Sequence, residues 1–553
     1  MPAFVGKIGS VQSPEAVRRL ACALPRGNDF DPLLELRRTG CHIISTSLPG
    51  NFSALEEELP FVLINGEVDG ASCFTISNSD FDIWPDNVPS SAKKLFSAVV
   101  VGSGNRPRVR LLRDRFGSKP LYFVFFESDF YFATALPPLL AISSSLRRPD
   151  DAVCSSFATF GCNVLEGRSP FSAIHSVPAG AVIEVESGGN IIKKSSPYRL
   201  AVPESGKGLR LNDKELDEAL RPLLSDAVLH LRTADKNIRS GLFFSGGLDS
   251  TILLALNGIK DSNFLLLTQG ASPNEKNDAR MTDDFAMALE FATSHELFLQ
   301  QCLLTPEQLE RDIVDYIWHA ALPMYSGSFD LLGGVAFHSL CRQASAMVDR
   351  IYCGEGADEL FMGYNRHHID IEALRLSLLS DKNNLHPELQ EWMDTQGVCD
   401  SPQHTATTLR RIMLTFGLSE YHFPSVEASA AAFNLKVRTP YIHEPLWDFV
   451  VALDDSMFID RLASPPWTKL PLRRLLRNLF PIDDKSVAKI STRRKRAMSE
   501  AANFVVSSLV HTHCGALADL DNFADLIRKV YYKIHINPGF SSRPNLSLKE
   551  LLR

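Results

Sequence analysis

The sequence predicts an α/β protein with a sheet-rich N-terminal domain and a doubly wound parallel sheet in the C-terminal domain. The chain has 553 residues, which is too long for one ordinary hydrophobic core. Short β-type runs fill the first 195 residues, whereas runs of strand length alternate with runs of helix length after residue 211. The composition, 45% apolar and 22% charged, is that of a globular protein.

The first predicted domain covers residues 1–195. Glycine, proline, asparagine and serine separate its β-rich runs, which are Phe61–Ile64, Ala98–Gly102, Arg108–Arg113, Pro120–Phe126 and Ala181–Glu186. Residues 196–211 contain Pro197, Pro203 and Gly206 and follow neither the strand nor the helix period. We therefore predict a linker over 196–211.

The second predicted domain covers residues 212–553. Asn212 followed by Glu215 predicts a capping box, and the leucines from Leu216 onward fall on one helical face. The alternating runs after this helix are Gly241–Phe244, Ser250–Asn257, Phe264–Thr268, Asp283–Thr293, Glu296–Leu299 and a helix capped by Thr305 and Pro306. Such alternation is typical of a parallel sheet with helices on both faces, and the chain beyond about residue 370 is helix-rich.

Charge and cysteine content exclude several classes of protein. The formal net charge of −8 gives no net attraction for nucleic-acid phosphates or anionic lipid, so we expect neither a nucleic-acid nor a membrane partner. The ten cysteines form no Cys-x-x-Cys pair, which argues against a zinc ribbon or a disulfide scaffold. The N-terminus has no signal-peptide pattern, and the apolar runs are of strand length. We expect a cytoplasmic protein, and a homodimer is left open.

A phosphate-binding loop is predicted at Ser245-Gly246-Gly247-Leu248-Asp249-Ser250, between a strand and a helix. Glycines let backbone N–H groups approach phosphate oxygens, and the helix N-terminus adds unpaired donors. The hydroxyls of Ser245 and Ser250 can donate hydrogen bonds, and Asp249 suits a site in which it holds Mg²⁺ on a triphosphate. An isolated Gly-Gly is more often an ordinary turn. The order of strand, loop and helix, without the Gly-Lys-Ser/Thr of a P-loop, favours ATP binding.

This hexapeptide resembles the signature of the N-type ATP pyrophosphatases, which cleave ATP between the α and β phosphates. The resemblance implies AMP and pyrophosphate as products. It leaves the acceptor open, because the family includes synthetases of asparagine, β-lactams, carbapenams, NAD and GMP as well as tRNA thiolases.

A second motif, Cys353-Gly354-Glu355-Gly356-Ala357-Asp358-Glu359, resembles a segment of asparagine synthetases. The resemblance implies that Gly354 lies at the ATP-pyrophosphate site, that Asp358 is the second carboxylate on Mg²⁺ opposite Asp249, and that Glu355 takes a proton as ammonia attacks the acyl-adenylate. Two carboxylates from separate strand ends suit Mg²⁺ bound to phosphates. β-Lactam-forming relatives have tyrosine in place of Glu355, so the carboxylate favours ammonia or an amine as nucleophile. The alternative is that Glu355 and Glu359 are solvated acids of a helix start.

Two later segments also resemble asparagine synthetases. In Lys436-Val437-Arg438-Thr439-Pro440, Arg438 and Pro440 match, whereas Lys436 replaces the glutamate of the family. The segment Lys469-x-x-Leu472-Arg473 followed by Arg493–Arg496 is similar to the region that closes over pyrophosphate. By this resemblance Lys495 stabilises the charge of the leaving group. The alternative is a solvated basic turn. Residues 363–368 and 493–498 are similar to a eukaryotic subgroup of the family.

In the first domain, Asn65-Gly66-Glu67 and the segment from Arg113 to Tyr122 resemble class II glutamine amidotransferases. The resemblance implies an N-terminal-nucleophile αββα sandwich. Those enzymes use a processed N-terminal cysteine, whose α-amino group activates the thiol. Here residue 2 is proline and the first cysteine is Cys22. We therefore expect glutamine hydrolysis to be absent, and we interpret Asn65 and Gly66 as structural turn residues.

These observations predict an asparagine synthetase-like ligase that uses ATP and Mg²⁺, adenylates an aspartate-like carboxylate and amidates it with ammonia. One alternative is adenylation with a different amine acceptor. Another is a non-catalytic homologue that binds nucleotide. Ser326, Ser328 and Asp330 lie in the region expected to bind the acceptor, but the sequence does not tie them to a ligand. His367 with His368 and the stretch His511–Cys514 are not assigned to a metal.

Overall fold

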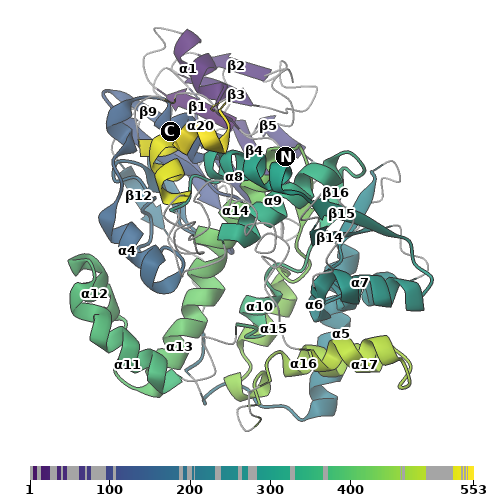
Figure 1. Cartoon of the computed structure of the whole chain (residues 1–553). Coiled ribbons are helices and arrows are strands. Elements are labelled where there is room, and N and C mark those ends of the chain that lie inside the picture. Colours follow the sequence, from purple (N-terminus) through teal and green to yellow (C-terminus); the bar gives the residue numbers. More distant parts are fainter. Residues whose placement is uncertain are drawn as a thin grey trace.

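The structure is a computed structural model of the whole chain (Figure 1). It describes residues 4–8, 14–24, 34–38, 41–45, 61–68, 71–75, 95–103, 108–185, 191–195, 202–204, 206–230, 238–259, 264–271, 283–323, 331–364, 371–460, 463, 467–493, 527–536, 540, 544 and 546–552.

Two antiparallel sheets of six strands form the N-terminal part. The first has the strand order β10 (His175–Ser176), β8 (Tyr122–Phe126), β9 (Asp129–Ala133), β1 (Phe4–Ile8), β3 (Cys41–Ser45) and β2 (Leu34–Arg38). The second has the order β12 (Ile191–Ser195), β11 (Val182–Val185), β7 (Val109–Arg113), β6 (Phe96–Val101), β4 (Phe61–Val68) and β5 (Ala71–Thr75).

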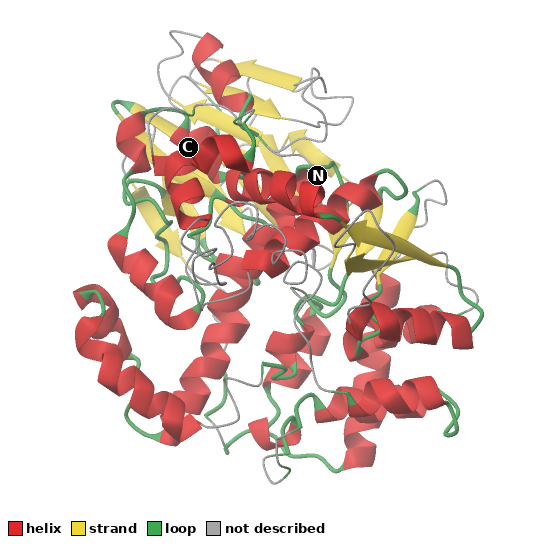
Figure 2. Ribbon diagram, in the orientation of Figure 1, coloured by secondary structure: helices red, strands yellow, loops and turns green. Residues whose placement is uncertain are grey.

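The two sheets pack face to face. Alternating residues of β1 show this, because Phe4 and Ile8 belong to the core between the sheets, whereas Val5 faces the opposite side. On that opposite side, helices α1 (Pro14–Ala21) and α3 (Leu136–Leu140) cover the first sheet (Figure 2). The stacked sheets and their helical cover confirm the sandwich expected from the sequence.

The interpretation of Asn65 and Gly66 as turn residues is wrong. Both lie inside β4, where Asn65 pairs with Ser97 and Gly66 pairs with Phe96 across the antiparallel ladder. The apolar run that was expected to end at Ile64 continues as a strand, because pairing with β6 extends to these polar residues.

The C-terminal part contains a five-stranded parallel sheet. Its order is β15 (Leu299–Leu304), β14 (Phe264–Ala271), β13 (Ser240–Phe243), β16 (Arg350–Tyr352) and β17 (Lys436–Arg438). Chain order runs one way from β13 to β15 and the other way from β16 to β17. The order therefore reverses between β13 and β16, and ligands of such sheets bind in the crevice at the carboxyl ends of these two strands.

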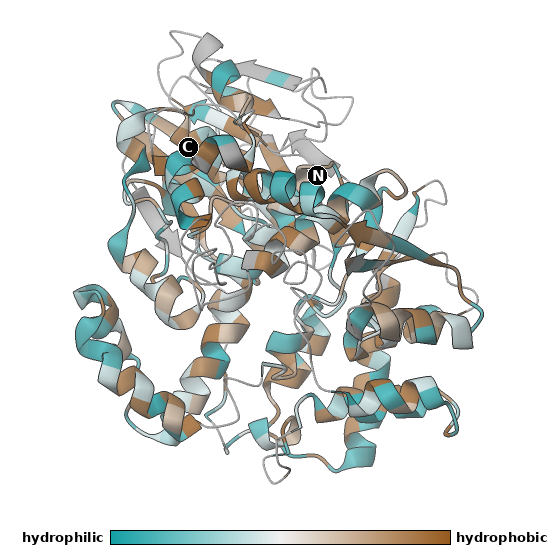
Figure 3. Cartoon of the chain, in the orientation of Figure 1, coloured by the Kyte–Doolittle hydropathy of each residue, from teal (hydrophilic) through white to brown (hydrophobic). Residues whose placement is uncertain are grey.

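Helices cover both faces of this sheet, as the predicted doubly wound fold requires. Leu242 packs toward α5 (Asp213–His230), α6 (Leu248–Asn257) and α16 (Leu470–Leu479), whereas Phe243 packs toward α9 (Leu331–Ser345) and α14 (Phe423–Ala431). The covering helices carry both hydrophilic and hydrophobic residues (Figure 3), which fits helices with one buried face.

The local signals at two helix starts are confirmed. The carboxylate of Glu215 accepts a hydrogen bond from the backbone N–H of Asn212 at 3.0 Å, and the Asn212 side chain accepts one from the N–H of Glu215. Helix α8 (Pro306–Ala320) begins with a capping box between Thr305 and Gln308. The strand expected at 296–299 is misplaced, because Glu296 has a left-handed φ of 57° and β15 begins only at Leu299.

The remaining elements of the described part are helices of α, 3₁₀ or π type. They are α4 (Asp151–Phe160), η3 (Ser144–Arg147), α7 (Asp283–Ser294), α10 (Ala357–Leu360), α11 (Ile371–Asp381), η5 (Lys382–Asn384), α12 (Pro387–Thr395), α13 (Pro402–Ile412), the π-helix η6 (Met413–His422), α15 (Glu444–Val451), η7 (Asp455–Met457), α17 (Lys485–Thr492), η8 (Tyr532–Ile536) and α20 (Leu548–Leu552). None of the helices in the described part of the chain combines the length and apolar character that crossing a bilayer requires.

The two parts share a buried interface. Phe116 of the first part belongs to the hydrophobic core of the second, where its ring meets Trp447 edge-on with centroids 5.1 Å apart. The end of the predicted linker is also held by the second part, because Leu209 and Asp454 are joined by a backbone hydrogen bond of 2.9 Å. The domain limits at residues 195 and 211 stay a prediction.

Candidate active site

The predicted phosphate loop lies at the carboxyl end of β13. The helix α6 after the loop has Gly247 as its N-cap, with no side chain capping the first backbone N–H groups. Ser245 and Ser250 lie with their hydroxyl oxygens 3.4 Å apart, and the Ser245 oxygen accepts a hydrogen bond from the N–H of Gly247 at 3.2 Å. The Ser250 hydroxyl also donates to the backbone oxygen of Gly247 at 3.3 Å. The loop thus places two hydroxyls beside a helix N-terminus, and helix N-termini bind anions.

Gly246 and Gly354 permit close approaches that larger residues would block. Gly246 has φ of 65°, and a Cβ there would lie 2.4 Å from the backbone nitrogen of Ala288 in α7. A Cβ on Gly354 would lie 3.1 Å from the Cβ of Asp249. The small residues therefore let the loop after β13 meet both α7 and the loop after β16.

In the structure, the two predicted Mg²⁺ ligands, Asp249 and Asp358, both contact Lys469. The ammonium of Lys469 lies 2.6 Å from Asp249 Oδ2 and 2.7 Å from Asp358 Oδ1. The Lys469 side chain is 5% exposed, so this cluster of one positive and two negative charges is largely shielded from water. Gly363 makes room for it, because a Cβ there would lie 1.8 Å from Asp358 Oδ1.

This donor set fits Mg²⁺ shared with phosphates. The two carboxylates supply hard oxygen ligands from the ends of neighbouring parallel strands, and Mg²⁺ commonly takes one or two carboxylates together with substrate phosphate oxygens. No group of three or more histidine, cysteine, aspartate or glutamate residues in the described ranges forms a metal cage of its own. Asp249 and Asp358 would thus hold Mg²⁺ that arrives with a nucleotide.

Glu355 lies in the loop between β16 and α10, facing His422 at the end of η6. His422 Nδ1 is 3.4 Å from Glu355 Oε2, and His422 Nε2 is 3.2 Å from Glu359 Oε1. The Tyr364 hydroxyl donates to Glu359 at 2.7 Å and lies 3.1 Å from His422 Nε2. One imidazole therefore bridges the candidate base and a second, buried carboxyl group.

The two glutamates differ in their surroundings. Burial raises the pKa of Glu359, and the nearby His422 lowers it by a smaller amount. Burial and the neighbouring acids also raise the pKa of Tyr364, so its hydroxyl stays protonated and remains a donor. The Glu355 side chain is 22% exposed, whereas the Glu359 side chain is 1% exposed. Glu359 is thus a buried partner of His422, which contradicts the alternative interpretation of Glu359 as a solvated acid.

Three basic residues of the later motifs have defined contacts in the structure. Arg438 ends β17, beside Tyr352 of β16. Arg473 donates to the backbone oxygens of Ser491 and Arg493 at 2.8 Å each, which fixes the end of α17. Arg493 in turn lies 2.7 Å from Asp284 of α7. The basic segment therefore starts next to the helix that touches Gly246.

Several predicted residues lie outside the described part of the chain. These are Pro2, Ser326, Ser328, Asp330, His367, His368, Lys495 and the stretch His511–Cys514. The role of Lys495 stays a prediction.

Sequence reasoning missed two residues of this site. Lys469 was part of a recognised motif, but its place between the aspartates depends on a left-handed backbone, with φ of 55°, at the start of α16. His422 belongs to no predicted motif. The sequence signal for His422 is its position 14 residues before Lys436. The segment between them leads into β17, which pairs with β16.

Asn65 borders a small cavity at the contact between the two parts of the protein. The cavity has a volume of about 30 Å³, and His319 of α8 and Glu427 of α14 also line it. Such a volume holds one or two molecules the size of water. Cys22, the first cysteine of the chain, lies elsewhere, exposed in the turn after α1.

The fold defines an α/β protein of two parts. The N-terminal part is an N-terminal-nucleophile-type sandwich, and the C-terminal part has the doubly wound parallel sheet of nucleotide-binding domains. Residues 219–522 match the family described as asparagine synthase, and residues 82–198 match the glutamine amidotransferase domain. The chain therefore belongs to the asparagine synthase family.

Its relatives include glutamine-hydrolyzing asparagine synthetases 1 and 2 of Bacillus subtilis. The first is 21% identical over 363 residues, covering 62% of this chain and 54% of that protein. The second is 25% identical over 414 residues, covering 69% and 53%. Amidase chyE of Penicillium rubens is 25% identical over 304 residues, covering 53% and 42%. The chain spans about half the length of the curated relatives it matches.

A solved glutamine phosphoribosylpyrophosphate amidotransferase from B. subtilis covers 65% of this chain and 77% of its own at 9% identity. Its TM-score of 0.22 is too low to support a statement about the fold.

Proposed function

We propose that this chain is an ATP-dependent amide ligase that adenylates an aspartate-like carboxylate and lets ammonia displace AMP. The observation that carries the proposal is the meeting of Asp249, Asp358 and Lys469 at the switch point of the sheet, next to the loop that bears Glu355. The names of the Bacillus relatives, which are asparagine synthetases, agree with this chemistry.

The first proposed step is attack of the acceptor carboxylate oxygen on the α-phosphorus of ATP, which releases pyrophosphate. The N-terminus of α6 and the hydroxyls of Ser245 and Ser250 bind the phosphates. Mg²⁺, held by Asp249 and Asp358, would neutralise charge on the phosphate oxygens. Lys469 stabilises the same negative charge from inside the crevice, as a fixed cation that needs little reorganisation.

The second proposed step is attack of the ammonia nitrogen on the acyl carbon, with AMP as the leaving group. The nitrogen must lose a proton as the C–N bond forms, and the Glu355 carboxylate takes it. General-base catalysis of this kind contributes typically about 10²–10⁴-fold to a rate. His422 keeps the Glu355 carboxylate facing the crevice.

The decisive experiment separates the two half-reactions. Aspartate-dependent exchange of pyrophosphate with ATP measures adenylation, and amide formation with ammonium or glutamine measures the complete reaction. Glu355→Gln should lower amide formation by about 10²–10⁴-fold and leave the exchange within a few-fold of wild type. Glu444→Gln, at the first turn of α15, is the matched control and should change neither rate.

Each outcome has a defined meaning. Amide formation from ammonium but not from glutamine supports the expected nitrogen donor, whereas equal use of glutamine refutes it. Exchange with an acid but no amide with either donor indicates a different amine acceptor. No exchange with any amino acid or dicarboxylic acid contradicts the ligase proposal and favours a nucleotide-binding protein without catalysis.

A further inference from the structure

We propose that the first domain positions the base of the second. Arg113 of the first domain holds the π-helix η6, and η6 in turn holds His422 against Glu355. The proposal assigns Arg113 and His422 as positioning residues, and it rests on the proposed function for the role of Glu355. The glutaminase-like domain would thus contribute to amide synthesis without any chemistry of its own.

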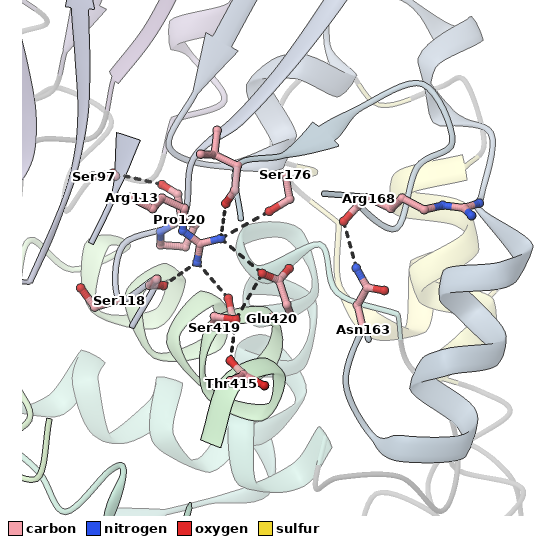
Figure 4. A network of polar contacts seen from close by, with 12 residues as sticks. Ser97, Arg113, Ser118, Pro120, Asn163, Arg168, Ser176, Thr415, Ser419 and Glu420 are labelled. Atoms are coloured by element: carbon pink, nitrogen blue, oxygen red, sulfur yellow. Dashed lines mark hydrogen bonds and ion pairs between the residues drawn. The ribbon is translucent and has the colours of Figure 1, made fainter. Parts of the chain in front are cut away.

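Arg113 leaves the end of β7 and enters the second domain (Figure 4). Its side chain is 1% exposed. One terminal nitrogen donates to the backbone oxygen of Val177 at 2.7 Å and lies 3.3 Å from Glu420 Oε1. The other donates to the backbone oxygen of Ser419 at 3.0 Å and to that of Gly117. A single guanidinium therefore ties the first domain to two consecutive residues of η6.

The loop that follows Arg113 is held in place by its own hydrogen bonds. The Asp114 carboxylate accepts hydrogen bonds from the backbone N–H groups of Phe96, Phe116 and Ser118 at 2.8–3.0 Å. Gly117 has φ of 62°, and a Cβ there would lie 2.8 Å from both the Arg113 guanidinium and the Ser419 Cβ. The η6 helix thus packs against a surface of fixed shape.

Further contacts of the same loop reach the neighbouring helices. Lys119, 4% exposed at its side chain, pairs with Glu427 of α14, the helix that directly continues η6. Phe116 packs on Trp447 of α15. The loop therefore contacts the π-helix, α14 and α15 together, so that η6 has little freedom to rotate or slide against the crevice.

The link from η6 to the candidate base is short. His422 is the last residue of η6 and comes two positions after Glu420. Its imidazole lies between Glu355 and Glu359, and its ring stacks on Tyr364 with centroids 6.2 Å apart. A helix of π-type geometry is uncommon and occurs frequently at functional sites. A shift of η6 would move His422 away from both glutamates together.

A chain of contacts alone does not establish coupling, so the test must measure coupling directly. Arg113→Met removes the tie to η6, and His422→Gln removes the contact to Glu355. If both act through the same positioning of Glu355, the double variant should lose no more activity than the more damaged single variant. Arg115→Gln is the matched control, because Arg115 lies in the same loop but pairs with Asp448 of α15.

We expect Arg113→Met to lower kcat for amide formation from ammonium by about 10-fold or more, while aspartate-dependent ATP–pyrophosphate exchange and the KM for ATP stay within about three-fold of wild type. Arg115→Gln should leave both rates unchanged. Equal loss in the two half-reactions would overturn the proposal, because it indicates general damage to the fold. Multiplying effects in the double variant would also overturn it, because they indicate that Arg113 and His422 act independently.

A readout without substrate separates this proposal from the proposed function. Hydrogen–deuterium exchange of residues 413–422 should rise in Arg113→Met and stay at the wild-type level in Arg115→Gln. Unchanged exchange in Arg113→Met refutes the proposed hold of Arg113 on η6, even if the ligase is active. If Arg113→Met does not fold, Glu420→Leu, which removes one partner of Arg113 and keeps the Ser419 carbonyl, takes its place in every comparison.

Discussion

Replacing Lys469 with methionine tests whether this lysine is the counter-ion of the two predicted metal ligands. Methionine keeps a long apolar side chain but removes the charge. The ammonium lies 2.6 Å from an oxygen of Asp249 and 2.7 Å from an oxygen of Asp358, so these oxygens are no more than 5.3 Å apart, the sum of the two distances. Without the lysine they repel each other.

The size of that repulsion depends on the separation. At an effective dielectric constant of about 20, two unit charges about 5 Å apart repel by about 3 kcal/mol. Breaking a buried ion pair by removing one partner costs a similar amount, about 3–5 kcal/mol. We therefore expect Lys469→Met to lower the free energy of unfolding by about 3 kcal/mol in the absence of divalent cations. Mg²⁺ should restore part of the loss, because it binds the two carboxylates of the folded state.

Denaturant titrations in EDTA and in excess Mg²⁺ measure both effects through the transition midpoints. Lys489→Met is the matched control, since Lys489 is 58% exposed and pairs with Glu290 on the surface. Such pairs contribute about 0–1 kcal/mol. If Lys469→Met had the wild-type midpoint in EDTA and gained no extra response to Mg²⁺, Lys469 would not be the counter-ion and the assigned metal site would be wrong.

Three further predictions concern single residues. Gly246→Ala places a Cβ 2.4 Å from the backbone of Ala288, so it should weaken ATP binding, measured by calorimetry, by at least about 10-fold. Burial raises the pKa of Glu420 from 4.5 to about 7. Between these pH values the folded state keeps a proton that the unfolded state releases, so the folded state is more stable at the lower pH. The free energy of unfolding should fall by up to about 3 kcal/mol as pH rises from about 4.5 through 7, and Glu420→Gln should abolish that fall; a fall of equal size in the variant would contradict it. Burial raises the pKa of the Cys353 thiol, so iodoacetamide should modify the exposed Cys22 well before it, as mass spectrometry can check.

The sequence predicted those features that depend on short stretches of chain. The alternation of strand and helix runs predicted the parallel sheet, and the residues around Asp249 and Asp358 predicted two loops that the sheet order then places side by side. Neighbouring parallel strands end at the same edge, so local motifs sufficed to assemble this part of the site.

Other features depend on contacts between distant segments. His422 meets Glu355 across 67 positions of the chain, on a π-helix that no regular hydrophobic period signals. Lys469 reaches the aspartates because its backbone is left-handed, and nothing in its neighbours requires that conformation. The interpretation of Asn65 and Gly66 as a turn failed because partner strand β6 decides whether such polar residues extend a strand.

Because Phe116 is part of the hydrophobic core of the second part, shortening the chain at its N-terminal side would change that core. A fragment that began at residue 212 would leave a gap beside Trp447 and would lose a ring that the remaining core needs for close packing. We therefore expect removal of the amidotransferase-like part to lower the stability of the ATP-binding part.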